Sequence, residues 1–283
     1  MEKPEEVMRL LLCIDDTPRS QPVLALGERL ALHLHAEVTL LIATPQSPSP
    51  LLVTTATDVC TRLRTAELPC TLLTQTDTPR RAIIAQTETV PYDLVIVGLL
   101  KRGRLQRWLR GPFIRRVLQT VSVPVLIVPS DRPTLQRILL CSSDLWYPVE
   151  TIRLVGQIAQ ATHAEVTILY VIPQPTLHYP VLHEIEDAWG ALLQTDTPQG
   201  RNLKAGRDTL RALGIDTGIS LRHGVVAEQI MAEIRTGEYD LVALGSTYAP
   251  QSSGRRFYMP SITEEVIAEA HRPVLVVRHR ESH

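Results

Sequence analysis

Two segments of the sequence carry residues that could bind a nucleotide or another anion. Asp15 follows an apolar run, and residues 98–111 form a loop bounded by Gly98 and Gly111. A carboxylate at the end of a buried strand commonly meets ribose hydroxyls or a base edge. A glycine-bearing loop that leads into a helix offers free backbone N–H groups to phosphate. These residue types therefore predict a phosphate-containing ligand.

Cationic side chains are concentrated in and just after this loop, with no acidic residue among them. They are Lys101, Arg102, Arg104, Arg107, Arg110, Arg115 and Arg116, with Trp108 between them. Because Arg makes bidentate contacts to phosphate, the segment could bind an anion through its side chains. The alternative is a solvated loop and helix whose cations pair with acidic residues of the other half of the chain.

Other chemistries have weaker support. His183 and Asp187 have the i, i+4 spacing of a metal-binding pair, but an exposed polar helix face is the preferred interpretation, and no metal is expected. Cys13 and Cys141 lie in apolar runs, which favours buried structural thiols over redox-active ones. The sequence has no P-loop, no dinucleotide-binding glycine pattern after the first strand and no Gly-x-Ser-x-Gly motif. We therefore predict that the protein is not an enzyme.

The chain consists of two copies of one sequence pattern. The pentapeptide His-Ala-Glu-Val-Thr occurs at residues 35–39 and again at residues 163–167. Tyr-Asp-Leu-Val and Pro-Val-Leu also occur once in each half, and the second copy carries extra residues near 174–213. The repeat predicts a first domain over residues 1–130, a second over residues 135–283, and an intrachain pseudo-dimer.

Each copy alternates short apolar runs with amphipathic segments. We expect strands at residues 9–14, 37–43, 71–75, 93–98 and 123–128, and again at 137–141, 165–172, 217–222, 240–245 and 273–277. Helices between them, such as the one with Val23, Leu26 and Leu30 on one face, would cover a parallel sheet through right-handed crossovers. Asp15 and Gly98 would then both lie at the carboxyl ends of strands, where ligands bind in such folds.

Composition and charge exclude several classes of protein. A chain of 283 residues with 44% apolar content suits two domains that each bury a core. A net charge of −1 argues against bulk attraction to nucleic acid, and no apolar run reaches the roughly 18 to 20 residues of a membrane span. The acidic first residues argue against a signal peptide. We expect a cytoplasmic protein with no nucleic-acid or membrane partner.

With its two copies, its Asp after the first strand, its Tyr-Asp-Leu-Val strand and its Pro-Val-Leu strand, the chain resembles the universal stress protein family in its tandem form. The resemblance implies an α/β fold with two tandem doubly wound parallel five-stranded sheets, each with strand order 3-2-1-4-5, and pairing of the last strands between domains. In nucleotide-binding members it implies ATP held by a loop of pattern Gly-x2-Gly-x9-Gly-(Ser/Thr).

That loop is incomplete in the first copy. Gly98 and Gly111 match its first and third glycines, but Lys101 stands at the second and Pro112 replaces the hydroxyl residue. Proline has no N–H to donate, although it suits the first turn of a helix. Asp15 does match the family's Asp.

The second copy departs further from the pattern. Gly245 and Ser261 match, but Tyr248 and Pro260 replace the other two glycines, and Ser143 stands where the Asp belongs. A large side chain in place of a glycine occupies the space into which phosphate would come. We therefore expect no nucleotide site in this copy, which would serve as a structural or interaction module.

These observations predict a non-catalytic stress-response or regulatory protein with one degenerate site. Its ligand would be ATP, another adenine nucleotide or a small anion, bound by Asp15, Gly98, Lys101, Arg102, Arg104 and Gly111. Protein partners are expected, and further homodimerisation stays open. The alternatives are a protein-binding scaffold with both sites defunct and a weak ATP-binding or ATP-hydrolysing member.

Overall fold

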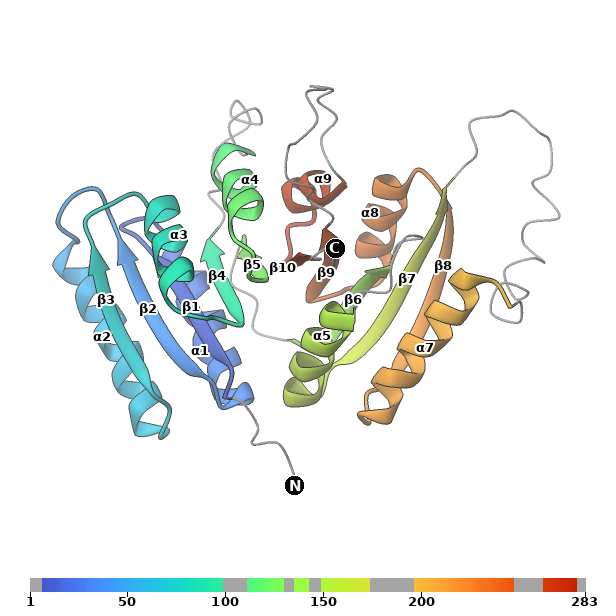
Figure 1. Ribbon diagram of the computed structural model, residues 1–283, viewed down its shortest axis with the longest axis horizontal. Helices are drawn as coiled ribbons and strands as arrows, with labels where there is room; N and C mark the ends of the chain where they lie inside the picture. The colour runs from blue at the N-terminus through green and yellow to red at the C-terminus, as the bar shows by residue number, and fades with distance from the viewer. Residues whose placement is uncertain are drawn as a thin grey trace. The chain divides into compact units, whose positions relative to one another are not determined.

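Strands and helices alternate within each half of the chain, in the residues that the structure describes (Figure 1). The computed structural model describes residues 7–98, 111–129, 135–142, 149–173, 196–246 and 262–278. They form two compact units, of which the first contains β1–β5, α1–α4 and β10, and the second contains β6–β9, α5 and α7–α9. None of the helices within the described ranges has the length and apolar character that a membrane span requires.

The first unit is a doubly wound sheet. Its strands are β1 (Arg9–Ile14), β2 (Glu37–Ala43), β3 (Cys70–Gln75), β4 (Leu94–Gly98), β5 (Val125–Val128) and β10 (Val274–Arg278). Their order is β3-β2-β1-β4-β5-β10, and the first five are parallel. The alternating sequence pattern predicted the parallel pairing, and the resemblance implied the order of the first five strands.

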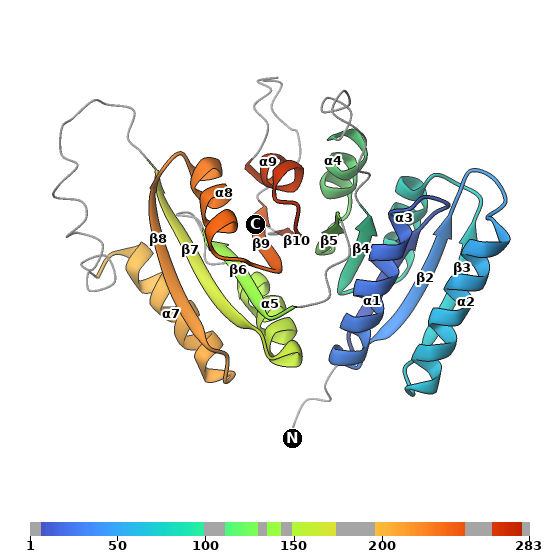
Figure 2. The same cartoon turned by 180° about the vertical axis from the view of Figure 1, so that it is seen from behind.

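Helices cover both faces of this sheet. They are α1 (Ser20–Leu34), α2 (Pro50–Thr65), α3 (Pro79–Thr89) and α4 (Gly111–Thr120). α1 contacts α2 on one face and α3 contacts α4 on the other, as Figures 1 and 2 show from opposite sides. The central strand β1 therefore has no solvent-facing side, and the side chains of Leu10, Leu11 and Leu12 are all fully buried. Such a strand holds polar groups only at its ends, which places Asp15 at the carboxyl end of β1.

The second unit repeats this plan. Its strands are β6 (Arg137–Ser142), β7 (Glu165–Pro173), β8 (Thr217–Gly224) and β9 (Leu241–Ser246), in the order β9-β6-β7-β8 and all parallel. Its helices are α5 (Val149–Thr162), α7 (Pro198–Ala212), α8 (Val226–Thr236) and α9 (Ile262–Glu269). The strand order matches the first four positions of the predicted 3-2-1-4-5 arrangement.

α2 and α7 are equivalent helices with the same start signal. The side chain of Ser49 accepts a hydrogen bond from the Leu52 N–H, that of Thr197 accepts one from the Gly200 N–H, and a proline follows each cap. α7, which lies in the extra segment of the second copy, is therefore the counterpart of α2. The rest of that segment, residues 174–195, lies outside the described residues.

The last strand of the second copy pairs with the last strand of the first. β10 runs antiparallel to β5, with Leu275 opposite Leu126. These two leucines hold the same position in the two copies of the Pro-Val-Leu sequence, so the equivalent strands pair about their own equivalent residues, as in an isologous contact. The predicted pairing of last strands is confirmed.

α1 packs on β1 without a side chain at Gly27. A Cβ at this position would lie 2.2 Å from Leu12 Cδ2 and 2.7 Å from Leu12 Cγ, and Leu12 is fully buried. We expect Gly27→Ala to reduce the free energy of unfolding by about 1–3 kcal/mol, since overpacking outweighs the gain in helix propensity.

Chemical denaturation of Gly27→Ala beside Gly218→Ala measures this effect. At Gly218 a Cβ would meet no atom within 4 Å, so that substitution serves as the control. Equal stability of the two variants would show that α1 does not approach β1 as closely as described.

Candidate functional site

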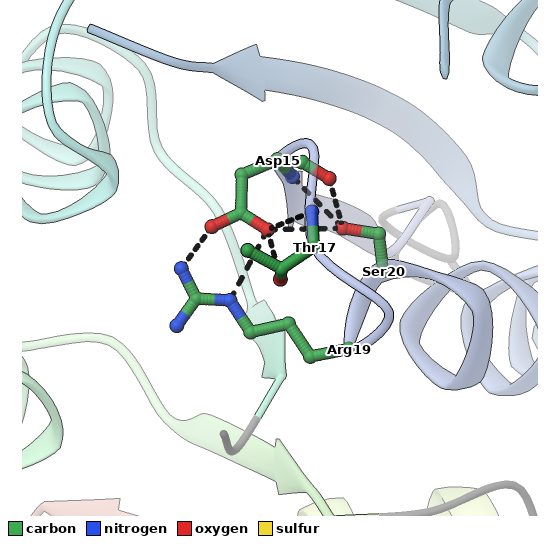
Figure 3. Close-up of polar contacts among 4 residues, drawn as sticks. All are labelled: Asp15, Thr17, Arg19 and Ser20. Carbon is green, nitrogen blue, oxygen red and sulfur yellow. Dashed lines mark hydrogen bonds and ion pairs between the residues drawn. The ribbon is translucent and has the colours of Figure 1, made fainter. Parts of the chain in front are cut away.

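Asp15, directly after β1, is hydrogen-bonded to three neighbouring side chains in the first unit (Figure 3). Its carboxylate accepts hydrogen bonds from the Thr17 N–H at 3.2 Å, from the Thr17 hydroxyl and from the Ser20 hydroxyl at 3.3 Å. The Ser20 hydroxyl also donates to the Asp15 carbonyl at 2.6 Å and accepts from the Asp15 N–H at 2.9 Å. Together these bonds fix the turn that leads from β1 into α1.

Arg19 supplies the charge opposite Asp15. Its Nε donates to Asp15 Oδ1 at 3.2 Å and its Nη2 pairs with Asp15 Oδ2, so the guanidinium faces the carboxylate with two nitrogens (Figure 3). Only 15% of the Arg19 side chain and 9% of the Asp15 side chain are exposed. A bidentate, largely desolvated pair of this kind is among the stronger polar contacts in proteins.

The Arg19 guanidinium also lies over the ring of Phe113 on α4, 5.4 Å from the ring centroid. The cavity that the described residues leave here has a volume of about 10 Å³ for the centre of a water molecule, so it has room for roughly one water. The hollow is lined by Cys13, Ile14, Asp15, Arg19, Pro79, Val97, Gly98 and Phe113. Arg19 thus fills the position at the carboxyl ends of β1 and β4 where the fold would place a ligand.

Gly98 makes room for Arg19. A Cβ on Gly98 would lie 2.7 Å from the Arg19 carbonyl oxygen and 2.8 Å from Arg19 Cβ. Because one of these contacts is to backbone, a larger residue at position 98 would push α1 away. The glycine that the sequence assigned to a phosphate loop therefore also has a packing role.

The pKa of Asp15 reflects two opposing effects. Burial raises it, but the hydrogen bonds from Arg19 and Thr17 and the positive charge of Arg19 outweigh burial, and the net pKa lies below the ordinary carboxyl value. Asp15 is therefore charged in the folded protein at neutral pH. Its charge is already compensated within the chain.

The structure brings together only part of the predicted site. Asp15 and Gly98 lie beside each other because β1 pairs with β4, with Cys13 opposite Val97. Gly111 is the first residue of α4, as its neighbouring proline suggested. Lys101, Arg102 and Arg104 lie outside the described residues.

The second unit carries a different polar cluster. β6 ends at Ser142, and Ser143, which replaces the Asp, lies outside the described residues. Farther along, Arg222 Nε donates to Glu233 Oε2 at 2.5 Å and the Tyr239 hydroxyl donates to Glu233 Oε1 at 2.8 Å. Burial raises the pKa of Glu233, but these hydrogen bonds outweigh it, so the net pKa is lowered.

The equivalent positions of the first unit hold neutral residues. They are Gln75, Gln86 and Tyr92, and the Gln86 side-chain amide donates to the Tyr92 hydroxyl at 2.9 Å. The two copies have therefore diverged in charge at a shared structural position. His183 and Asp187 of the insertion are outside the described residues, and the part of the chain that the structure describes has no group of three or more His, Cys, Asp or Glu side chains that could hold a metal.

Sequence reasoning missed Arg19, Phe113 and the disulfide between Cys60 and Cys70. Arg19 lies four residues after Asp15, a spacing that brings two side chains together when the second residue begins a helix. That spacing was the available signal. The ten-residue separation of the two cysteines matches no familiar motif.

Sequence comparison places the chain in a family. The profile of the Universal stress protein family matches residues 6–129 and 135–278. The chain belongs to the universal stress protein family. It carries two copies of the family domain, as the resemblance suggested. None of the curated proteins compared with the chain matches its sequence significantly.

Solved structures of tandem length support the same fold. A putative universal stress protein from Pseudomonas aeruginosa UCBPP-PA14 is 18% identical with a TM-score of 0.71, covering 96% of this chain and 93% of its own. A universal stress protein from Archaeoglobus fulgidus DSM 4304 is 17% identical with a TM-score of 0.68, covering 95% of this chain and 98% of its own. At this level of identity the likeness establishes the fold.

The pairing of Asp15 with Arg19 predicts a pH-dependent contribution to stability. Asp15→Asn should reduce the free energy of unfolding by about 1–3 kcal/mol near neutral pH, because the Arg19 charge stays buried without its partner. The folded-state pKa of Asp15 is lowered, so its stabilisation is present above the ordinary carboxyl pKa and is lost as pH falls below it. The difference between wild type and variant should therefore shrink below about pH 4.

Urea denaturation across pH tests this prediction, with Glu88→Gln on the exposed side of α3 as the control. A difference between Asp15→Asn and wild type that stays constant down to low pH would contradict a stabilising charged Asp15.

Proposed function

We propose that this universal stress protein is a non-catalytic regulatory protein whose first domain has an adenine-nucleotide or related anion site that Arg19 keeps closed in the absence of ligand. One observation carries the proposal. The Arg19 guanidinium is paired with Asp15 and leaves a hollow of about 10 Å³, whereas small-molecule sites in proteins occupy roughly 300 Å³ or more. A ligand must displace Arg19 before it can reach Asp15.

A phosphate-bearing ligand could make that displacement favourable. When the guanidinium leaves Asp15, it can pair with a phosphate, and the freed carboxylate can accept hydrogen bonds from ribose hydroxyls. Both charges then keep a partner, so opening costs less than the loss of an ion pair. Lys101, Arg102 and Arg104, with the N–H groups near Gly98 and Gly111, would add to phosphate binding.

The choice of a binding protein rather than an enzyme rests on the sequence. Family membership together with the missing nucleotide-hydrolase motifs supports regulation through binding, in the cytoplasm and with protein partners. The second domain would act as a structural or interaction module, because Ser143 replaces the Asp and Tyr248 replaces a loop glycine. A scaffold with both sites defunct is the second candidate.

Binding of adenosine and of ATP to Arg19→Ala distinguishes the closed nucleotide site from the scaffold, because these two ligands differ only in the triphosphate. We expect the variant to bind adenosine about tenfold more tightly than wild type, because the competing ion pair is gone. The gain for ATP should be smaller, since the same substitution removes a donor to phosphate. Titration calorimetry measures both affinities, and ligand-induced rises in melting temperature provide a second readout.

Arg81→Ala, an exposed Arg on α3 in the same domain, is the matched control and should bind as wild type does. Native mass spectrometry of protein purified without added nucleotide gives a further check. Absence of adenosine and ATP binding in both wild type and Arg19→Ala would favour the scaffold, whereas turnover of ATP above background would contradict a non-catalytic role.

A further inference from the structure

Cys60 and Cys70 join α2 to β3 through a disulfide. Cys60 lies near the end of α2 and Cys70 is the first residue of β3, and their Cα atoms are 5.4 Å apart, within the range that a disulfide spans without backbone movement. All four cysteines of the chain lie in the described residues, and Cys13 and Cys141 are unpaired. Disulfide chemistry is therefore confined to this one pair.

The second unit shows what this helix–strand contact needs. Arg64 on α2 donates to the Cys70 carbonyl at 2.6 and 3.0 Å, and Arg211 on α7 donates to the Thr217 carbonyl at 2.9 Å. Thr217 lies opposite Val166, as Cys70 lies opposite Val38, so the two strand positions are equivalent.

The apolar contact between helix and strand is also the same in both units. Leu63 on α2 and Leu210 on α7 are equivalent residues, and both are fully buried. The position equivalent to Cys60 is Arg207, so the second unit forms the same helix–strand contact without a disulfide. The fold does not need the bond, and the cysteine pair is an addition specific to the first unit.

We propose that Cys60 and Cys70 form a reversible thiol–disulfide site that controls the order of β3. In the cytoplasm, where the sequence composition led us to expect the protein, persistent structural disulfides are rare, and a bond between such a pair is more typically redox-responsive. The inference does not depend on the nucleotide site.

The reaction is a two-electron exchange with a small disulfide such as oxidised glutathione. One cysteine thiolate attacks a sulfur of oxidised glutathione, forming a mixed disulfide and releasing one glutathione thiolate. The second cysteine thiolate attacks the mixed disulfide, which forms the Cys60–Cys70 bond and releases the second glutathione. The protein sulfurs are oxidised, oxidised glutathione is reduced to two thiols, and the two cysteine protons pass to the leaving thiolates.

Access to the pair depends on local opening of the end of α2. Cys60 is 2% exposed and Cys70 is 5% exposed, but residues 64–67 between them are exposed. Helix ends open at low free energy, so a small reagent reaches the sulfurs without global unfolding. By contrast, Cys13 lies inside a strand, where burial raises its pKa to about 12 and disfavours the reactive thiolate.

β3 is the element that the bond would control. It is the outer strand of the first unit, paired only with β2 along its length in the described part of the sheet, and most of its side chains are partly exposed. Its other end leads through a short turn into α3, whose first residue, Pro79, lines the hollow around Arg19. Loss of the bond would therefore loosen a strand that leads directly to a wall of the candidate site.

Mass spectrometry after alkylation tests the pair in the full-length wild-type protein. Protein equilibrated in oxidising glutathione buffer and then denatured should be alkylated at Cys13 and Cys141 only. Protein that is reduced while natively folded, freed of reductant and then denatured should be alkylated at all four cysteines. Reduction should lower the melting temperature by roughly 5–10 °C, and reoxidation should restore it. A bond that never forms, or that resists dithiothreitol in the folded protein, would overturn the proposal.

Hydrogen exchange locates the effect and contains its own control. Peptides that cover β3 should exchange faster in the reduced protein, whereas peptides that cover β8, the equivalent strand without a cysteine, should not change. The double variant Cys60→Ser, Cys70→Ser should have the melting temperature of reduced wild type, whatever the redox state of the glutathione buffer. Cys141→Ala should show the same change in melting temperature on reduction as wild type. Equal exchange of β3 in both redox states would contradict control of this strand by the bond.

Discussion

A carboxylate at the end of a strand buried on both faces must find compensating donors, and this constraint organises the first domain. Asp15 meets it with Thr17, Ser20 and Arg19, so the same contacts that satisfy the charge also set the start of α1. Arg19 in turn requires a glycine at position 98 and an aromatic ring from α4. The Asp15–Arg19 pair therefore compensates the desolvation of the carboxylate, and under the proposed function a ligand could replace Arg19 only if it supplied Asp15 with equivalent donors.

The repeat and the strands could be predicted from the sequence because each depends on local apolar patterning and on motifs that occur twice, whereas the strand order came from the resemblance to the family. Asp15 and Gly98 could be placed together for the same reason, since parallel strands align their carboxyl ends. The contact between Arg19 and Asp15 could not be predicted, because pairs of opposite charge at i, i+4 are also common on exposed helices. What distinguishes this pair is its burial at the end of β1, which only the structure reveals. The Cys60–Cys70 pair could not be found because its proximity arises from the tight return of α2 into β3, which the spacing alone does not reveal.

The two copies agree at the amino ends of their strands and differ at the carboxyl ends. In the first, the Arg9 N–H donates to Asp93 at 2.8 Å and Arg9 pairs with Glu37; in the second, the Arg137 N–H donates to Asp240 at 3.1 Å and Arg137 pairs with Glu165. These contacts tie neighbouring strands together in both copies. The carboxyl ends, where Asp15 faces Arg19 in one copy and Ser143 replaces the Asp in the other, are where function would be selected. In a duplicated chain, comparison of equivalent positions in the two copies thus helps to separate structural residues from candidate functional ones.

Strand exchange gives the second copy a structural role in the first domain. β5 would otherwise be an open edge with unpaired backbone groups, a position prone to aggregation, and β10 covers it through the Leu126–Leu275 pairing. Arg278 adds a contact from the end of β10 to the Val121 carbonyl at 3.4 Å. The first domain therefore depends on a strand that the second copy supplies. If the second copy has no nucleotide site, as proposed, selection for this strand would still preserve its fold while Ser143 stands in place of the family's Asp and Tyr248 in place of a loop glycine.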